Sequence, residues 1–294
     1  MAATLRQLRE RKKSVGSVMK ITKAMELIAA SRVVKAQARA KAMESYTHEL
    51  VKAVSAVAAD TTEVHPLTTK HKTSGRAGVL IISGDRGMAG AYNANVIRVG
   101  EGLMERLKPD YDVDLYVCGG KAIDYFHFRG VFPEMEWSGF SEKPTHDRAK
   151  EIGQYLIDEF LRTDEDGGVD ELHVVFTRFR SLVSQQTRIV RLLPLEIVRG
   201  EGETGRGQLY HYEPDADTVL NALLPLYIFN RIHFALAESA ASELAARQQA
   251  MHSATDNAKD LTGRLTRDIN QARQAAITQE INEIVGGAGA LAGK

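Results

Sequence analysis

The chain has 294 residues, of which 44% are hydrophobic, and its 38 basic residues equal its 38 acidic residues in number. This length and composition allow a buried core in one or two domains and exclude a wholly disordered chain. Cys118 is the only cysteine, which excludes an internal disulfide framework and a multi-cysteine zinc site. Since we find no run of about 18 apolar residues and no hydrophobic secretory segment at the N-terminus, we expect a soluble protein that is not exported.

The distribution of prolines divides the chain into three parts. All seven prolines lie between Pro66 and Pro225, and most of the glycines and aromatic residues lie in the same stretch. Because proline and glycine interrupt helices, this pattern predicts a compact middle domain with two long helical arms. We place the three parts at 1–65, 66–215 and 216–294.

Each arm is rich in helix-favouring residues and repeats apolar residues three and four positions apart. The clearest repeat is a seam in the C-terminal arm, formed by Ala258, Leu261, Leu265, Ile269, Ala272, Ala276 and Ile284. A helix of about 60 residues is roughly 90 Å long, so it extends beyond the middle domain. Such a helix gains little stability alone, and the two arms are therefore predicted to pack on each other as an antiparallel coiled coil.

The middle of the chain alternates strand patterns with helix patterns, which predicts an α/β domain with a Rossmann-like sheet. Strands are expected at 78–83, 112–118, 171–177 and 188–193, and helices at 91–107, 121–129 and 146–162. The predicted fold class is therefore α/β, with a long antiparallel coiled coil of the N- and C-terminal helices added to a central Rossmann-like domain.

A glycine-rich turn, Gly84-Asp85-Arg86-Gly87-Met88-Ala89-Gly90, lies between a predicted strand and a predicted helix. Backbone amides at such a place can bind phosphate. However, the spacing matches neither GxGxxG nor GxxxxGK[ST]. A nucleotide site therefore stays open as one interpretation, and the spacing favours the other, in which the glycines only allow close packing of strand and helix.

The other polar clusters in the sequence do not indicate a catalytic site. His65 and His71 lie beside Pro66 without cysteine partners or an HExxH motif, which favours loop residues over metal ligands. The acidic segment 164–168 contains two glycines and is predicted to be a solvated loop rather than an acid–base pair. We therefore expect no catalytic residues, no bound metal and no cofactor.

The charges are distributed unevenly. Residues 1–41 contain 11 Lys and Arg but only Glu10 and Glu26 on the acidic side. A basic helix can bind nucleic acid, but Tyr46 is the only aromatic residue in the N-terminal arm, so base-stacking residues are missing. Two interpretations stay open: the solvated face of a coiled coil, and a surface for acidic partner proteins.

The C-terminal segment 277–290 reads ITQEINEIVGGAGA, and the N-terminal arm contains KITKAME at 20–26. Together with ESAASE at 238–243 and ATDNA at 254–258, these segments closely resemble the gamma subunits of rotary F-type ATP synthases of the bacterial type. The glycine-rich turn is also similar to the SDRGLCGG-like segment of that family. The likeness begins at the first residues, so we expect no transit peptide.

The resemblance implies the central stalk, or rotor shaft, of a proton-translocating ATP synthase. A shaft of this family is non-catalytic and couples rotation of the membrane ring to the conformational cycle of the catalytic beta subunits. The implied partners are the hexamer of alpha and beta subunits, the epsilon subunit and the membrane c-ring. Nucleic acid binding and direct membrane insertion are not implied. The implied location is peripheral, at the cytoplasmic face of the bacterial cell membrane.

The resemblance also assigns contact residues. Those implied to face the alpha and beta hexamer are Lys20, Lys23, Met25, Arg247, Gln248, Arg273, Gln274, Thr278 and Glu280. Those implied to meet epsilon and the ring are Tyr210, Tyr212, Glu213 and Asp215. At each position the alternative is an ordinary solvent-facing or seam residue.

Two departures from the family and two competing functions remain. The chloroplast members carry a regulatory cysteine pair, which Cys118 alone excludes here, and the acidic loop 164–170 has no counterpart that we can place. The first competing function is a nucleotide enzyme that uses the glycine-rich turn and recognises its substrate with the arms. The second is a nucleic-acid-binding protein with a basic arm.

Overall fold

The computed structural model describes residues 4–60, 65–69, 74–162, 167–195 and 212–292, with side chains described up to Ala58 in the first range and up to Val285 in the last. The chain divides into two compact units, one of Met1–Ile28 with Gln248–Lys294 and one of Ala29–Arg247. We call them unit 1 and unit 2. The sequence-based boundaries at 65/66 and 215/216 stay a prediction.

Two long helices contribute to both units. Helix α1 is Leu5–Asp60, with 56 residues, and helix α5 is Ala216–Ala292, with 77 residues. Helix α5 contains Pro225, which lacks an amide hydrogen and so leaves one backbone hydrogen bond of the helix unmade. The two long helical arms expected from the sequence are thus present.

In unit 1, α1 and α5 run antiparallel. The Thr255 hydroxyl donates to the Thr22 hydroxyl at 2.9 Å, and the imidazole of His252 lies 3.2 Å from the Glu26 carboxylate. As the partner in α1 advances from 22 to 26, the partner in α5 falls from 255 to 252. Leu265 of the predicted seam is buried. The predicted antiparallel coiled coil is confirmed.

The same antiparallel pairing is present in unit 2. The side-chain amide of Asn230 in α5 donates to the hydroxyl of Thr47 in α1 at 2.7 Å. A small apolar cluster also joins the two helices, formed by Val33, Ala36, Ala241, Leu244 and Ala245. Because most of these side chains are alanine, the two helix backbones can approach closely.

The rest of unit 2 is organised around a five-stranded sheet. Its strands are β1 (Arg76–Ile82), β2 (Asp112–Cys118), β3 (Met135–Trp137), β4 (Glu171–Phe179) and β5 (Gln185–Leu193). Their order is β3-β2-β1-β4-β5, with parallel pairing from β3 to β4 and antiparallel pairing of β5 with β4. The four expected strands are confirmed. Strand β3 was not predicted, because three residues are too few to show a periodic pattern.

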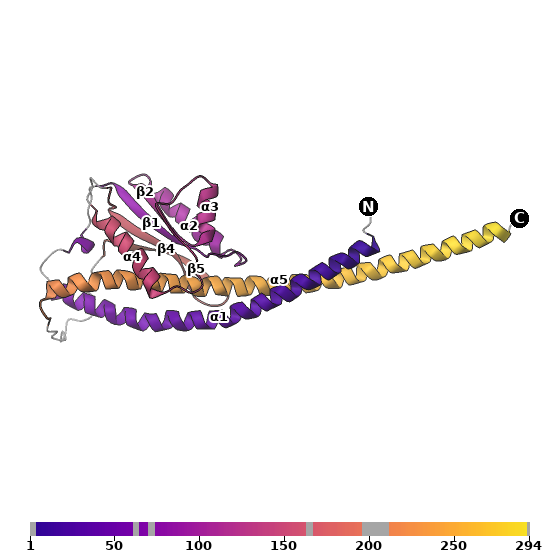
Figure 1. Ribbon diagram of the computed structural model, residues 1–294, viewed down its shortest axis with the longest axis horizontal. Coiled ribbons are helices and arrows are strands. Elements are labelled where there is room, and N and C mark those ends of the chain that lie inside the picture. The colour runs from indigo at the N-terminus through magenta and orange to yellow at the C-terminus, as the bar shows by residue number, and fades with distance from the viewer. Residues whose placement is uncertain (1–3, 61–64, 70–73, 163–166, 196–211, 293–294) are drawn as a thin grey trace. The chain divides into compact units, whose positions relative to one another are not determined.

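Helices cover both faces of the sheet, as Figure 1 shows. Besides α1 and α5, they are α2 (Tyr92–Leu107), α3 (Gly120–Phe128) and α4 (His146–Leu161), with a short 3-10 turn, η1, at Pro66–Thr68. Successive residues of β1 face opposite layers. Val79 and Ile81 belong to the core with α2 and α3, whereas Leu80 and Ile82 belong to the core with α4 and α5.

Two glycines bring helices close to their neighbours. A Cβ atom on Gly100 of α2 would lie 2.3 Å from Cδ1 of Ile81, and one on Gly153 of α4 would lie 2.5 Å from Cδ1 of Phe229 in α5. These distances are too short for any larger residue without movement of its neighbour. Glycine at these places therefore sets the spacing of the layers.

One described helix is long and apolar enough to cross a membrane by length and composition alone. A window of 18 residues in α5 has a mean hydropathy of 1.3, and 44% of that window is buried inside the protein. The core helix of a soluble protein passes the same test. The finding is therefore weak support for a membrane span, and the expectation of no direct membrane insertion stays a prediction.

The Thr22–Thr255 pair predicts a disulfide between the two helices. Replacing both residues by cysteine should give a crosslinked chain on mild oxidation, because the two hydroxyls are in contact and the side chains have the size that a disulfide needs. Mobility on a non-reducing gel measures the crosslink. The native Cys118 does not compete, because it is buried and burial raises the pKa of its thiol.

The control for this test combines Thr22→Cys with Thr266→Cys, which places the second cysteine about three turns further along α5. In the observed register this second pair should stay reduced. Equal crosslinking of both pairs, or of neither, would contradict the register.

Candidate functional site

The glycine-rich turn Gly84–Gly90 follows β1 and lies beside the end of β2. Within it, the Asp85 carboxylate accepts hydrogen bonds from the amide of Gly120 at 3.0 Å and from the amide of Ser141 at 2.9 Å. Gly120 begins α3, and the first amides of a helix are where a phosphate would bind. The chain therefore fills this anion position with its own carboxylate.

These amides stabilise the ionised form of the Asp85 carboxylate. Burial by itself raises the pKa of Asp85, but hydrogen bonds from the amides of Ser141, Gly139 and Gly120 outweigh burial, so the pKa is lowered overall. The amide of Gly84 donates to the side chain of Asn93 at 2.8 Å, which fixes the start of the turn. These contacts support the structural interpretation of the turn over the nucleotide site.

A group of charges with a buried centre, the Arg247 cluster, lies next to this turn in unit 2. We define it as Arg247, Glu243, Glu142 and Arg32. The guanidinium of Arg247 contacts Glu243 at 2.6 Å and Glu142 at 3.0 Å, and Arg32 forms an ion pair with the second oxygen of Glu142. The same guanidinium also approaches the backbone carbonyls of Arg86 and Gly87, at 3.5 and 3.4 Å.

The Arg247 cluster is almost shielded from solvent at its centre. The side chain of Glu243 is completely buried and that of Arg247 is 7% exposed. Burial raises the pKa of Glu243, and the Arg247 guanidinium opposes this rise. Since Arg32 is in α1, Arg247 and Glu243 are in α5, and Glu142 precedes α4, the cluster ties both long helices to the α/β part of unit 2.

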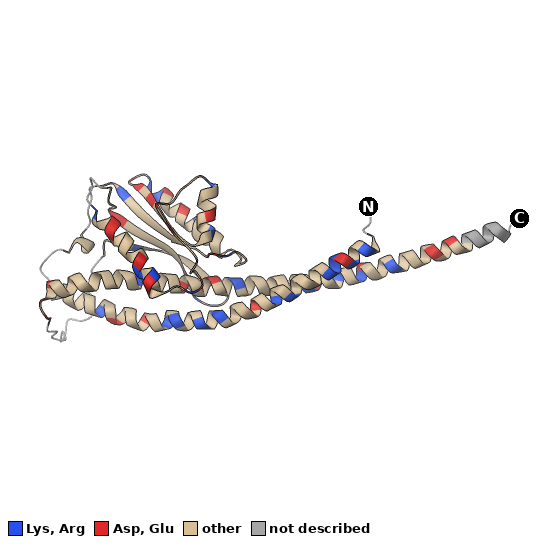
Figure 2. Ribbon diagram, in the orientation of Figure 1, with Lys and Arg blue, Asp and Glu red and all other residues tan. Residues whose placement is uncertain are grey.

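The residues expected to contact the hexamer lie mainly in unit 1. Lys20 and Lys23 of α1 are exposed, and Met25 is half-buried. In α5, Gln248 is half-buried, and the exposed members of the set are Arg273, Gln274, Thr278 and Glu280. Figure 2 shows basic residues, in blue, spaced along α1. Arg247 differs from the rest, because its side chain points into the cluster described above.

The last part of α5 has an exposed apolar stripe. Extending the register of Thr22 with Thr255 back to Leu5 brings the described start of α1 opposite Ala272. Beyond that point the side chains face solvent: Ile277, Ile281, Ile284 and Val285 are 45%, 54%, 71% and 66% exposed. The predicted seam therefore continues in sequence to Ile284, but its last residues have no described α1 residue opposite them.

The residues expected to meet epsilon and the ring lie just before α5. Tyr210 falls outside the described residues. Tyr212 packs against the core of unit 2, and Glu213 is exposed. Asp215 caps α5, because its carboxylate accepts from the amide of Thr218 at 2.8 Å and from its hydroxyl at 2.9 Å. These hydrogen bonds from Thr218 lower the pKa of Asp215.

The remaining polar candidates have structural contacts or cannot be placed. The imidazole of His65 accepts a hydrogen bond from the amide of Leu67 at 3.0 Å, which makes it part of the loop. His71 and most of the acidic segment 164–168 fall outside the described residues. Within the ranges that the structure describes, we find no cluster of three or more His, Cys, Asp or Glu that could hold a metal ion.

The fold and these surfaces define a class of protein: a coiled-coil protein with an α/β domain and with exposed polar and apolar side chains along its long helices. A family model described as ATP synthase matches residues 4–291 of the chain. The chain is 53% identical to the ATP synthase gamma chain of Cutibacterium acnes and 52% identical to that of Nocardioides sp., and each match covers 99% of this chain and 98% of the relative. The chain belongs to the ATP synthase gamma chain family.

Solved structures share the fold. A chain of the Euglena gracilis mitochondrial ATP synthase, in a structure described as OSCP/F1/c-ring, matches with a TM-score of 0.69 and 18% identity over 98% of this chain and 94% of its own length. A chain of the Tetrahymena thermophila structure described as central stalk/cring matches with a TM-score of 0.57 and 20% identity over 80% of this chain and 99% of its own. Together with the relatives, these matches support the predicted fold class.

The Arg247 cluster predicts a large loss of stability when its centre is broken. Arg247→Met should lower the free energy of unfolding of the full chain by about 3–5 kcal/mol, because it leaves the buried Glu243 without its cation. Adding Glu243→Gln to this variant should recover part of the loss, because the uncompensated charge is removed. Urea unfolding followed by circular dichroism measures both.

The matched control is Lys121→Met, which breaks the exposed Lys121–Asp124 pair and should change stability by less than about 1 kcal/mol. A cost for Arg247→Met as small as that of the control would show that the cluster does not hold the helices.

Proposed function

We propose that the chain is the central stalk, or rotor shaft, of a proton-translocating ATP synthase and couples rotation of the membrane ring to the conformational cycle of the catalytic beta subunits. The observation that carries this proposal is the exposed apolar stripe on α5 beyond the start of α1. Family membership supports it, since relatives about half identical over nearly the full chain are named ATP synthase gamma chain.

The apolar stripe is suited to a turning contact. A row of exposed isoleucines on one helix favours burial against another protein. Apolar contacts are non-directional, so they do not hold a shaft at one angle as a set of hydrogen bonds would. The apolar part of this contact therefore resists rotation of the end of α5 less than hydrogen bonds would.

Coupling requires that the shaft present different faces to the surrounding subunits. A rotating partner changes the population of a site's conformations only if its faces interact differently with them. In unit 1 the exposed surface combines Lys20 and Lys23 with apolar side chains such as Ile21 on α1. We propose that this mixed surface faces the alpha and beta subunits, with the lysines near acidic segments of beta.

The remaining hexamer contacts are proposed on α5. Exposed Arg273, Gln274, Thr278 and Glu280 offer hydrogen-bonding groups around the apolar stripe. Gln248 belongs to the same proposed set. The last member, Arg247, is held within its ion-pair cluster, so we propose that it contributes mainly by fixing the helices near the contact.

The other partners in this proposal are the epsilon subunit and the membrane c-ring. We propose that they are contacted by Tyr210, Tyr212, Glu213 and Asp215. Exposed Glu213 is available to a partner, whereas Tyr212 and Asp215 also have contacts within the chain. We place the chain as a peripheral protein at the cytoplasmic face of a bacterial cell membrane. It acts without an active site of its own, which the internal occupation of the glycine-rich turn by Asp85 supports.

The hexamer contact predicts a defect in coupling when Met25 is changed. Met25→Lys adds a cation to a surface already occupied by Lys20 and Lys23, and it should bind acidic segments of beta too strongly. We expect ATP-driven proton pumping to fall more than ATP hydrolysis, at normal levels of assembled complex. Normal pumping in this variant would remove Met25 from the contact set. The control is Lys35→Met on α1 in unit 2, which should leave both activities unchanged.

The proposed contact of residues 210–215 with epsilon and the ring predicts that ATP hydrolysis and proton pumping can be separated. Tyr210→Ala combined with Glu213→Lys should weaken the joint with epsilon and the ring while the coiled coil stays intact. Soluble hexamer–shaft complex should then hydrolyse ATP normally, and membranes should pump fewer protons. Glu105→Lys on α2 makes the same charge change elsewhere and serves as the control. A parallel fall of both activities, or no change in either, would contradict the assignment of residues 210–215 to this contact.

A further inference from the structure

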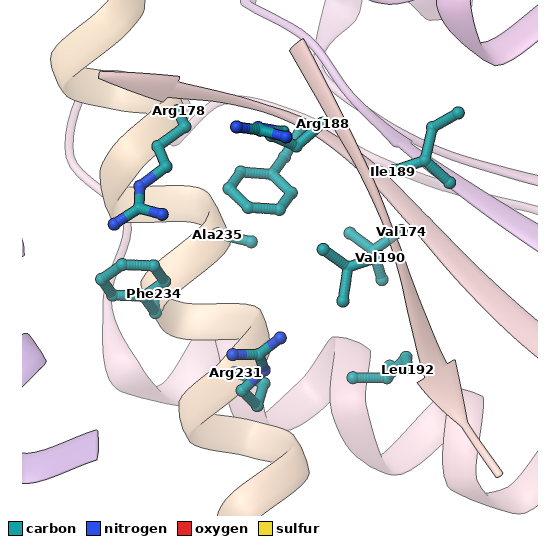
Figure 3. Close-up of a pocket in the computed structure, with 10 residues that line it drawn as sticks. Val174, Arg178, Arg188, Ile189, Val190, Leu192, Arg231, Phe234 and Ala235 are labelled. Atoms are coloured by element: carbon teal, nitrogen blue, oxygen red, sulfur yellow. The ribbon is translucent and has the colours of Figure 1, made fainter. Parts of the chain in front are cut away.

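Unit 2 contains a pocket that the proposed contacts with the hexamer and the ring do not use. It has a volume of about 350 Å³ and lies between α5 and strands β4 and β5 (Figure 3). Its apolar lining includes Val174, Phe176, Val190, Leu192, Phe234 and Ala235. Three basic side chains surround this lining: Arg178, Arg188 and Arg231. The pocket thus combines an apolar interior with a cationic rim.

The positive charge of this rim is poorly balanced. Arg178 lies 4.0 Å from the carboxylate of Glu238, which already accepts a hydrogen bond from the amide of Phe179 at 2.9 Å. Within the described part of the chain, neither Arg188 nor Arg231 has an ion-pair partner. The rim therefore favours an anionic ligand, and guanidinium groups are well suited to carboxylates.

The pocket opens beside a free sheet edge. Strand β5 is the last strand of the sheet, and no strand among the described residues pairs with its outer side. Arg188, Val190 and Leu192 are alternate residues of β5, so they face the same side of the sheet, toward the pocket. A strand added to β5 would place its own alternate side chains on that side, next to the pocket.

We propose that the outer edge of β5 and the adjoining pocket bind an extended acidic segment of another protein. The main chain of the segment pairs with β5, one large apolar side chain enters the pocket, and its carboxylates face Arg188 and Arg231. The same arginines repel a second copy of β5, because two cationic rims would meet. The rim therefore selects an acidic partner and opposes edge-to-edge pairing of this chain with itself. This inference does not depend on the proposed function.

The test uses the full chain and a fluorescent peptide of sequence Thr-Glu-Thr-Phe-Thr-Glu-Thr, in which Phe and both Glu residues lie on one face of the extended strand, with binding measured by anisotropy. We expect saturable binding that weakens as salt is added. Arg188→Gln combined with Arg231→Gln should weaken binding at least tenfold, because the carboxylates lose their cations. The control, Arg98→Gln with Arg148→Gln, removes two arginines from α2 and α4 outside the pocket and should leave binding unchanged. Circular dichroism checks that both variants fold.

Two further probes separate strand pairing from binding of a simple anion. The same peptide with alternate amides methylated should bind at least tenfold more weakly, because it cannot donate to β5. Decanoate, an apolar anion without a backbone, should compete poorly. Absence of saturable binding, equal binding by the arginine variant, or equal binding by the methylated peptide would overturn the proposal. Strong competition by decanoate would also overturn it, in favour of a site for small amphiphilic anions.

Discussion

The structure of unit 2 depends on one constraint: a single helix, α5, must pack against both the sheet and α1. Its residues from Ala235 to Ala245 are buried without interruption, because one side faces the sheet core and the other faces α1. A helix buried on two sides loses the polar face that an ordinary surface helix keeps. This double burial accounts for the apolar character of α5, and it brings buried Glu243 and Arg247 into the interior, where they must find partners within the chain.

The fold was largely predictable because its main elements have strong local signals. The strand 112–118 was predicted with the observed bounds, and the helices at 91–107 and 146–162 were predicted to within one residue at each end. The antiparallel pairing of the arms followed from two long helical patterns, because a single helix of that length gains little stability alone. The short strand β3 and the exact register of α1 with α5 were not predictable, since both depend on contacts between residues far apart in the sequence.

The candidate site was predictable only in part. The resemblance to a family supplied the expected contact residues, but it could not show which of them point into the chain. Arg247 has the spacing of four from Glu243 that allows an ion pair along a helix, which was a usable signal. Its contacts with Glu142 and, through it, with Arg32 join residues more than 100 positions apart, and single-sequence patterns give no sign of them. The same limit explains why the pocket beside β5 was not foreseen.

The antiparallel pairing of α1 with α5 also has a consequence for the order of events during synthesis. Thr22 leaves the ribosome early, but its partner Thr255 follows 233 residues later. At a synthesis rate of about 5–20 residues per second, α1 stays without its partner helix for roughly 10 to 50 s. An isolated helix is marginal over that time, and exposed apolar residues invite aggregation. The excess of basic residues in 1–41 makes unpaired arms of different chains repel each other over this interval.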